Sequence, residues 1–215
     1  MNERRRHFVN ASDVAVIIEG VLVFTSGSST RDALFNRIVG LSPPLVMTEA
    51  MVHGANNEAN VATMHANRTG LILFDGFSSI VHPLIPWMAA SPDRVSFDKE
   101  TKAVTNVEIK APFYRRVSQA SIATVDHVKH DYKHYWHQMQ CQMFCMNLDV
   151  TDYVVCGLPP NINHPTERSI VYSCCSIPRD TTWWRSSRNE IIAFANRVYA
   201  YRGEAMPPLP PSLLI

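Results

Sequence analysis

Two acidic residues and a lysine near the middle of the chain have types and spacing that suit phosphodiester chemistry. Glu108 and Lys110 are two residues apart in the β-rich run VEIKAP, so their side chains should project from one face of a strand while Ile109 faces the core. The polar turn DKET precedes this run. Antiparallel pairing through that turn would bring Asp93, at the start of the previous strand, alongside Glu108. We therefore expect two carboxylates to converge beside an ammonium group.

Converging carboxylates predict a magnesium site. Mg²⁺ takes oxygen ligands in octahedral geometry and usually keeps several waters, so Asp93, Glu108 and the backbone carbonyl of Ile109 would share its shell with a scissile phosphate. Mn²⁺ is the alternative ion. Lys110 would orient or help deprotonate the attacking water and offset the charge that develops at phosphorus. Taken alone, this combination is more often an ordinary salt bridge on a surface strand.

Helical and β-rich patterns alternate along the chain and predict the elements that position these residues. Apolar spacing and capping signals predict helices over 13–20, 31–40, 48–68, 134–148 and 182–201, with Ser12 as the N-cap of the first. Strands are expected within 71–77, 85–97, 103–113, 152–156 and 169–175. The first three of these strand runs are typical of an antiparallel meander.

The bulk composition predicts one soluble, intracellular domain. The 215 residues, 46% of them hydrophobic, supply one core, so we expect a single domain over 1–205 and an extended proline-rich tail over 206–215. The net charge of +1 gives no global attraction to polyanions, so nucleic-acid binding would need a local basic patch. Five cysteines, an odd number without a secretory signal, indicate reduced thiols, and no apolar stretch is long enough to span a membrane.

Several short motifs in a fixed order resemble one enzyme family. SPD at 91–93, EIKAPF at 108–113 and YWHQMQCQMF at 135–144 resemble motifs of the PD-(D/E)XK nucleases of the lambda exonuclease or YqaJ-type viral recombinase family. The segments at 51–65 and 5–14 resemble its upstream helix and its N-terminal element. The resemblance covers about residues 5–156. It implies an α/β (α+β) fold with a restriction-endonuclease-like core, in which a central mixed β-sheet is flanked by helices.

The resemblance implies catalytic roles at matching positions. Asp93 and Glu108 would be direct metal ligands and Lys110 the catalytic lysine. Glu58 would add a carboxylate near the metal from its helix. Gln138 would hold the lysine or a phosphate oxygen, although an exposed polar residue of a helix is an equally good interpretation of it.

A second group of residues would recognise the end of a DNA strand. The resemblance implies that Arg5, Ser12 and Ser91 form a pocket for a 5′-phosphate, for which the planar fork of Arg is well suited. Ser12 is equally an N-cap and Arg5 a flexible terminal residue. The family usually has Gly where this chain has Arg94; a positive φ there would cost about 1 kcal/mol with Arg, and Arg94 would otherwise contact phosphate.

The implied activity is Mg²⁺-dependent exonuclease action on linear double-stranded DNA in the 5′ to 3′ direction, for recombination or viral DNA processing. Double-stranded DNA ends are then the implied substrate and a single-strand annealing protein a candidate partner. The resemblance leaves the subunit count open, between a homo-oligomer such as the trimer of lambda exonuclease and the monomer of related viral enzymes. Two alternatives stay open: an endonuclease or RNase of the same fold, and a catalytically silent nucleic-acid-binding module.

Overall fold

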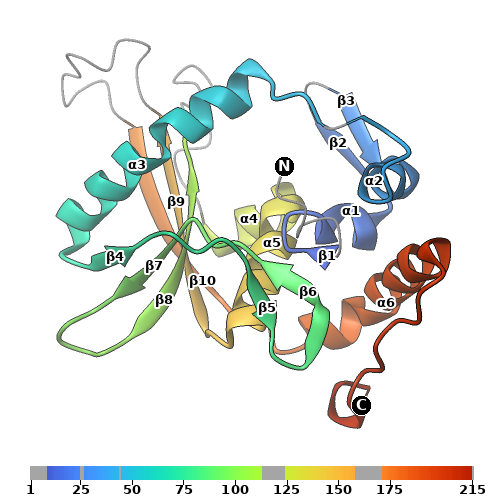
Figure 1. Cartoon of the computed structure of the whole chain (residues 1–215). Helices are drawn as coiled ribbons and strands as arrows, with labels where there is room; N and C mark the ends of the chain where they lie inside the picture. Colours follow the sequence, from blue (N-terminus) through green and yellow to red (C-terminus); the bar gives the residue numbers. More distant parts are fainter. Residues whose placement is uncertain (1–8, 25–26, 44, 113–123, 158–170, 215) are drawn as a thin grey trace.

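The central sheet of the fold is mixed and has five strands, in the order β10-β9-β8-β7-β4, on the left in Figure 1. The computed structural model describes residues 9–24, 27–43, 45–112, 124–157 and 171–214. The strands of this sheet are β4 (Ile72–Phe74), β7 (Arg94–Phe97), β8 (Val104–Lys110), β9 (Val150–Gly157) and β10 (Val171–Pro178). Strands β8 and β9 are parallel, and the other neighbours are antiparallel. The predicted mixed sheet is confirmed.

Strand β8 is covered on both faces by long helices, α3 (Glu49–Thr69) and α5 (Lys133–Met146) (Figure 1). On one face Val107 and Ile109 pack in a cluster with Val61 of α3. On the other face, the side chains of Asn106 and Glu108 form hydrogen bonds with α5. Glu108 therefore lies in the interior and not on the open surface strand that is the simplest interpretation of its sequence.

The expected strand run 85–97 is divided between two sheets. Its first part is β6 (Ile85–Ala90), the middle strand of a small sheet with β1 (Val9–Asn10) and β5 (Ile80–His82), in the order β1-β6-β5. Its second part is β7 of the central sheet. Pro92, which cannot donate a backbone hydrogen bond, lies in the connection between them. The expectation of a simple meander was wrong at this point.

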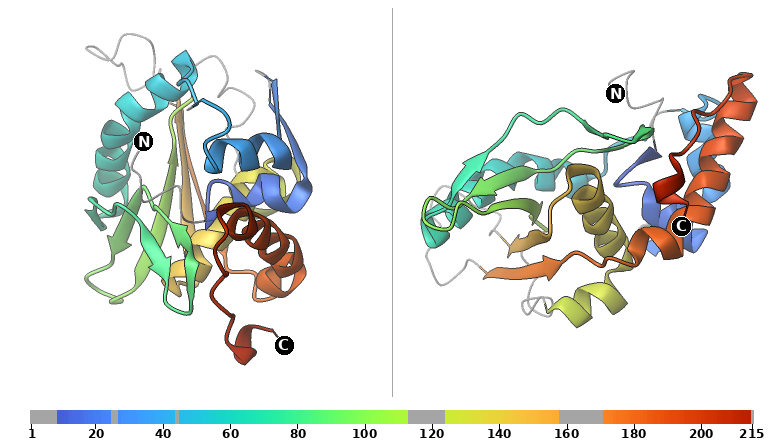
Figure 2. Two further views of the ribbon diagram at one scale, coloured as in Figure 1. Left: turned by 45° about the vertical axis from the view of Figure 1, so that its right-hand side comes forward. Right: turned by 90° about the horizontal axis from the view of Figure 1, so that it is seen from below.

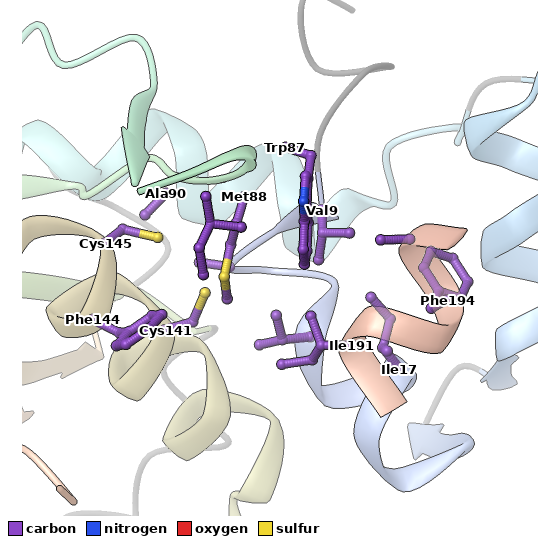
Figure 3. Close-up of a cluster of buried hydrophobic side chains, with 14 of the residues drawn as sticks. Val9, Ile17, Trp87, Met88, Ala90, Cys141, Phe144, Cys145, Ile191 and Phe194 are labelled. Carbon is purple, nitrogen blue, oxygen red and sulfur yellow. The ribbon is translucent and has the colours of Figure 1, made fainter. Parts of the chain in front are cut away.

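The largest hydrophobic cluster joins the small sheet to the remaining helices. These are α1 (Val14–Glu19), α2 (Arg31–Ile38) and α6 (Trp183–Arg202). Figure 3 shows Trp87 and Met88 of β6 between Cys141 of α5 and Ile191 of α6. The hairpin of β2 (Val21–Phe24) and β3 (Gly27–Thr30) and the helix α4 (Val125–Asp131) were not expected. All five cysteines are free thiols, and none of the described helices combines the length and apolarity needed to cross a membrane.

The C-terminal segment is packed against the protein and does not extend freely. Met206, Leu209 and Leu213 contact the largest hydrophobic cluster. The carbonyl of Leu213, in the short 3₁₀ helix η4 (Pro211–Leu213), accepts hydrogen bonds from Trp184 Nε1 at 3.0 Å and Arg188 Nη1 at 3.2 Å. The segment consequently lies beside α6 (Figure 2).

Candidate active site

Asp93 and Glu108 lie opposite each other where β7 begins. The antiparallel register of β7 and β8 pairs Arg94 with Val107, so the next pair outward is Asp93 and Glu108. Asp93 Oδ2 accepts a hydrogen bond of 2.7 Å from the backbone N–H of Ile109. Because the N–H and C=O of one strand residue point to the same side, the carbonyl of Ile109 faces this edge as well. The expected antiparallel pairing, which brings Asp93 alongside Glu108, is confirmed.

Glu108 is fully buried and is held by three donors. Its Oε1 accepts a hydrogen bond of 2.7 Å from Gln138 and forms an ion pair with Lys110, and its Oε2 accepts a hydrogen bond of 2.6 Å from Gln142. Gln138 therefore holds the carboxylate, whereas the resemblance implied a contact with the lysine or a phosphate. Sequence reasoning missed Gln142. The signal was present, because residues four apart on a helix share a face.

A buried chain of amides fixes the orientation of Gln142. Asn106 Nδ2 donates to Gln142 Oε1 at 2.9 Å and to Thr151 Oγ1 at 3.0 Å. Because the oxygen of the Gln142 amide accepts from Asn106, its nitrogen is the end that faces Glu108. Strands β8 and β9 and helix α5 are thus connected by one polar network around the carboxylate.

Lys110 is held as an ammonium ion. Burial by itself would lower the pKa of Lys110, but the carboxylates of Glu108 and Asp93 outweigh that effect and raise the pKa above its ordinary value. The ammonium group also lies 4.8 Å from the centre of the Tyr135 ring. A lysine held in this state suits charge stabilisation and water orientation, and it does not suit removal of a proton from water.

At the carboxyl group of Asp93, burial and neighbouring negative charge outweigh the positive charge of Lys110. Burial and the charge of Glu108 raise its pKa to about 7, against the opposing effects of Lys110 and the Ile109 N–H. Its Oδ1 accepts no hydrogen bond from the described residues, and a carboxylate has about four acceptor positions. Free oxygen acceptors in a place where negative charge is in excess fit a hard cation such as Mg²⁺.

The number of ligands at this place is limited. Within the described parts of the chain, no three Asp, Glu, His or Cys side chains gather in a way that could hold a metal ion. An ion between Asp93 and Glu108 would therefore draw its remaining ligands from the Ile109 carbonyl, water and substrate. This is how Mg²⁺ is usually bound, with few carboxylates and several waters.

Glu58 reaches the edge of the site from α3 but is paired with Arg94. Arg94 Nη1 lies 2.7 Å from Glu58 Oε1 and also donates to the backbone carbonyl of Asp93. Among the described residues, the non-glycine residues with positive φ are Lys102 and Asn147, so Arg94 carries none of the strain considered for its position. It bridges two acidic residues of the site.

Two of the three residues expected at a 5′-phosphate pocket lie at adjacent strand ends. Strand β1 runs parallel to β6, with Asn10 opposite Ala89, so Ser12 and Ser91 follow the same ends of neighbouring strands. Asp13, and not Ser12, is the N-cap of α1, and Ser91 Oγ donates to the carbonyl of Ser78 at 3.0 Å. Arg5 lies outside the described residues.

Comparison with known families gives one match over most of the chain. The model of a family described as YqaJ-like viral recombinase domain matches residues 2–153, a range that includes every residue of the site above. No curated protein matches this chain significantly.

Solved structures with a similar fold include two exonucleases. The crystal structure of an alkaline exonuclease from Laribacter hongkongensis is 24% identical, with a TM-score of 0.66 over 92% of this chain and 91% of that chain. The structure of that enzyme in complex with dAMP gives 24% identity and a TM-score of 0.67 over 93% and 91%. A phage-related exonuclease from Haemophilus somnus 129PT is 14% identical, with a TM-score of 0.66 over 91% and 94%. These likenesses establish a PD-(D/E)XK-type fold.

Proposed function

Because the chain belongs to the YqaJ-like viral recombinase domain family, we propose that it is a metal-dependent exonuclease that hydrolyses phosphodiesters of linear double-stranded DNA. One observation carries this proposal: Asp93 lies opposite Glu108, and Lys110 forms an ion pair with Glu108 beside them. A module that only bound DNA would have no use for carboxylates here, since they repel phosphates. Two of the proteins with similar solved structures are exonucleases, which supports the proposal.

Mg²⁺, or Mn²⁺ in its place, would be held by Asp93, Glu108 and the carbonyl of Ile109. When bound, the ion would supply an activated water and polarise the scissile phosphate. Gln138 and Gln142 keep the Glu108 carboxylate in one orientation through their hydrogen bonds. Lys110, held as an ammonium ion, offsets the negative charge that accumulates on the phosphate oxygens as water attacks.

We propose further that the direction is 5′ to 3′ and that Ser12, Ser91 and Arg5 hold the terminal 5′-phosphate. The parallel ends of β1 and β6 support this assignment, because they bring the two serines to the same level, and Ser91 lies two residues before Asp93 in the chain. We also propose that the protein acts as a homotrimer with a single-strand annealing protein as its partner, both by analogy with lambda exonuclease.

Labelled linear duplex DNA tests the activity and its direction together. With Mg²⁺ present, a label on the 5′ end should be released before a label on the 3′ end, and a 5′-hydroxyl end should be cut more slowly than a 5′-phosphate end. Glu108→Gln should release neither label, because it removes a metal-binding charge and keeps the shape. Covalently closed circular DNA and RNA should stay intact, and cleavage of either one would indicate an endonuclease or RNase.

The molecular mass in solution tests the proposed trimer, which should have three times the mass of one chain.

A further inference from the structure

We propose that the guanidinium group of Arg94 takes the place of a second metal ion, so that each chain binds one divalent cation. This inference rests on the proposed function, because it concerns the same site. Many phosphodiester hydrolases hold two ions about 4 Å apart, one at the attacking water and one at the leaving oxygen. In this chain, Glu58 is the third carboxylate that would help to bind a second ion, and it is paired with the positive side chain of Arg94.

One nitrogen of the Arg94 side chain contacts both α3 and the residue before β7. Its Nη1 lies 2.7 Å from Glu58 Oε1 on α3 and also donates to the carbonyl of Asp93, next to β7. The Arg94 side chain is 13% exposed and that of Glu58 is 34% exposed. The pair is therefore more shielded from solvent than a typical surface ion pair, and salt screens it less.

This ion pair leaves Glu58 poorly placed to act as a metal ligand. One carboxylate oxygen of Glu58 is already engaged by the guanidinium group of Arg94. A second divalent ion at Glu58 would have to displace the guanidinium or lie beside it, and like charges at such distances repel strongly in a partly buried site. Oδ1 of Asp93, in contrast, accepts no hydrogen bond from the described residues and remains available for the first ion.

The formal charges of the site balance with one ion. In their ionised forms Asp93, Glu108 and Glu58 carry three negative charges, and Lys110 and Arg94 carry two positive charges. One divalent cation and one phosphodiester group bring the total to zero. A second divalent cation would leave two uncompensated positive charges, which is costly in a partly buried site.

Arg94 also has N–H groups that could stabilise the leaving oxygen, which is the role of the second ion in two-metal sites. Both of its hydrogen bonds use Nη1, and its Nε and Nη2 make none to the described residues. The planar guanidinium matches the geometry of phosphate oxygens. We assign to these free N–H groups the stabilisation of the leaving oxygen.

The number of Mn²⁺ ions bound per chain tests this assignment without any turnover. Titrations of the metal-free full chain, followed by calorimetry and by electron paramagnetic resonance, should give one ion for the wild type. Arg94→Gly and Arg94→Gln should each bind a second ion, and the pair should show the spin coupling of two neighbouring Mn²⁺ ions. Arg94→Lys, which keeps the charge, should still bind one. Circular dichroism shows whether each variant is folded.

The other outcomes are distinguishable. Two ions in the wild type would overturn the inference and leave the nuclease proposal intact. One ion in the wild type and in both uncharged variants would also overturn it, because Arg94 would then not be the group that excludes the second ion. No ion at all in the wild type would overturn the inference together with the proposed metal-dependent function.

Discussion

Gln142 donates a hydrogen bond of 2.6 Å to Oε2 of Glu108, and both side chains are completely buried. A carboxylate in such a place needs donors, because an ionised group that loses its partners in the interior costs several kcal/mol. Gln142 also accepts from Asn106, so it cannot rotate without breaking a second bond. The orientation of the proposed metal ligand is thus fixed by a residue that touches neither metal nor substrate.

Replacing Gln142 with Leu should weaken metal binding by about 10-fold to 100-fold, the usual effect of losing a group that orients a ligand. Calorimetric titration with Mn²⁺ measures this. Gln140→Leu is the matched control, because Gln140 is equally buried on α5 but bonds to the backbone of Pro178 and Asp180. Gln140→Leu should lower stability and leave metal affinity within about twofold; equal affinity losses in both variants would contradict the role of Gln142.

Tyr135 should affect the rate of hydrolysis through Lys110. The ammonium group lies 4.8 Å from the ring centre, and a contact of this kind contributes about 1 kcal/mol, which corresponds to about fivefold in rate. Tyr135→Phe keeps the ring and should leave kcat unchanged, whereas Tyr135→Leu should lower kcat about fivefold with little change in KM. Steady-state hydrolysis of linear duplex DNA distinguishes these results, and an equal loss in both variants would show that the hydroxyl group matters instead.

Acid should destabilise the fold through His82. Its ring is buried against Phe144, its Nδ1 accepts the backbone N–H of Leu84 at 3.1 Å, and burial together with the charge of Arg179 lowers its pKa to about 4. A lowered folded-state pKa gives stability that is present above the unfolded value of 6.5 and is lost as pH falls toward 4.

The titration of His82 should lower the free energy of unfolding by about 2 kcal/mol between about pH 7 and about pH 5. Urea unfolding at both pH values, compared with His82→Gln, isolates it, because Gln can accept the same hydrogen bond and does not titrate. A variant that loses as much stability as the wild type over this interval would exclude His82 as the cause.

The C-terminal segment should contribute to the free energy of unfolding through Leu213 and not through its neighbour Leu214. Leu213 packs against the largest hydrophobic cluster, whereas Leu214 is 52% exposed. Leu213→Ala should lower the free energy of unfolding by about 1 kcal/mol, since its side chain is only partly buried, and Leu214→Ala should change it by less than about 0.5 kcal/mol. Urea denaturation measures both. Equal effects would mean that this segment is not held as described.

The sequence predicted the parts of the site that follow local rules. The two-residue period of a strand placed Glu108 and Lys110 on one face, and the turn at 98–101 allowed the antiparallel register that brings Asp93 opposite Glu108. The helices expected over 31–40 and 48–68 begin within one residue of α2 and α3, whose N-caps are Thr30 and Thr48. These features depend on neighbours within a few residues.

The sequence could not predict contacts that depend on how distant elements pack. Arg94 and Glu58 are 36 residues apart, and no local rule pairs them. The burial of Glu108 follows from α5 lying over β8, which the strand pattern alone does not contain. The assignment of β6 to a second sheet depends on its pairing with β1, a strand of two residues that is too short to recognise from sequence.

Hydrolysis of DNA at Asp93, Glu108 and Lys110 can be measured as the release of acid-soluble nucleotides from linear duplex DNA in the presence of Mg²⁺. The wild type and Lys99→Met, which changes an exposed lysine of the β7–β8 turn, should release nucleotides at the same rate. Lys110→Met should be at least about 100-fold slower while it remains folded. A Lys110→Met protein as active as the wild type, or a wild-type protein that releases nothing, would show that these residues do not form the active site of a nuclease.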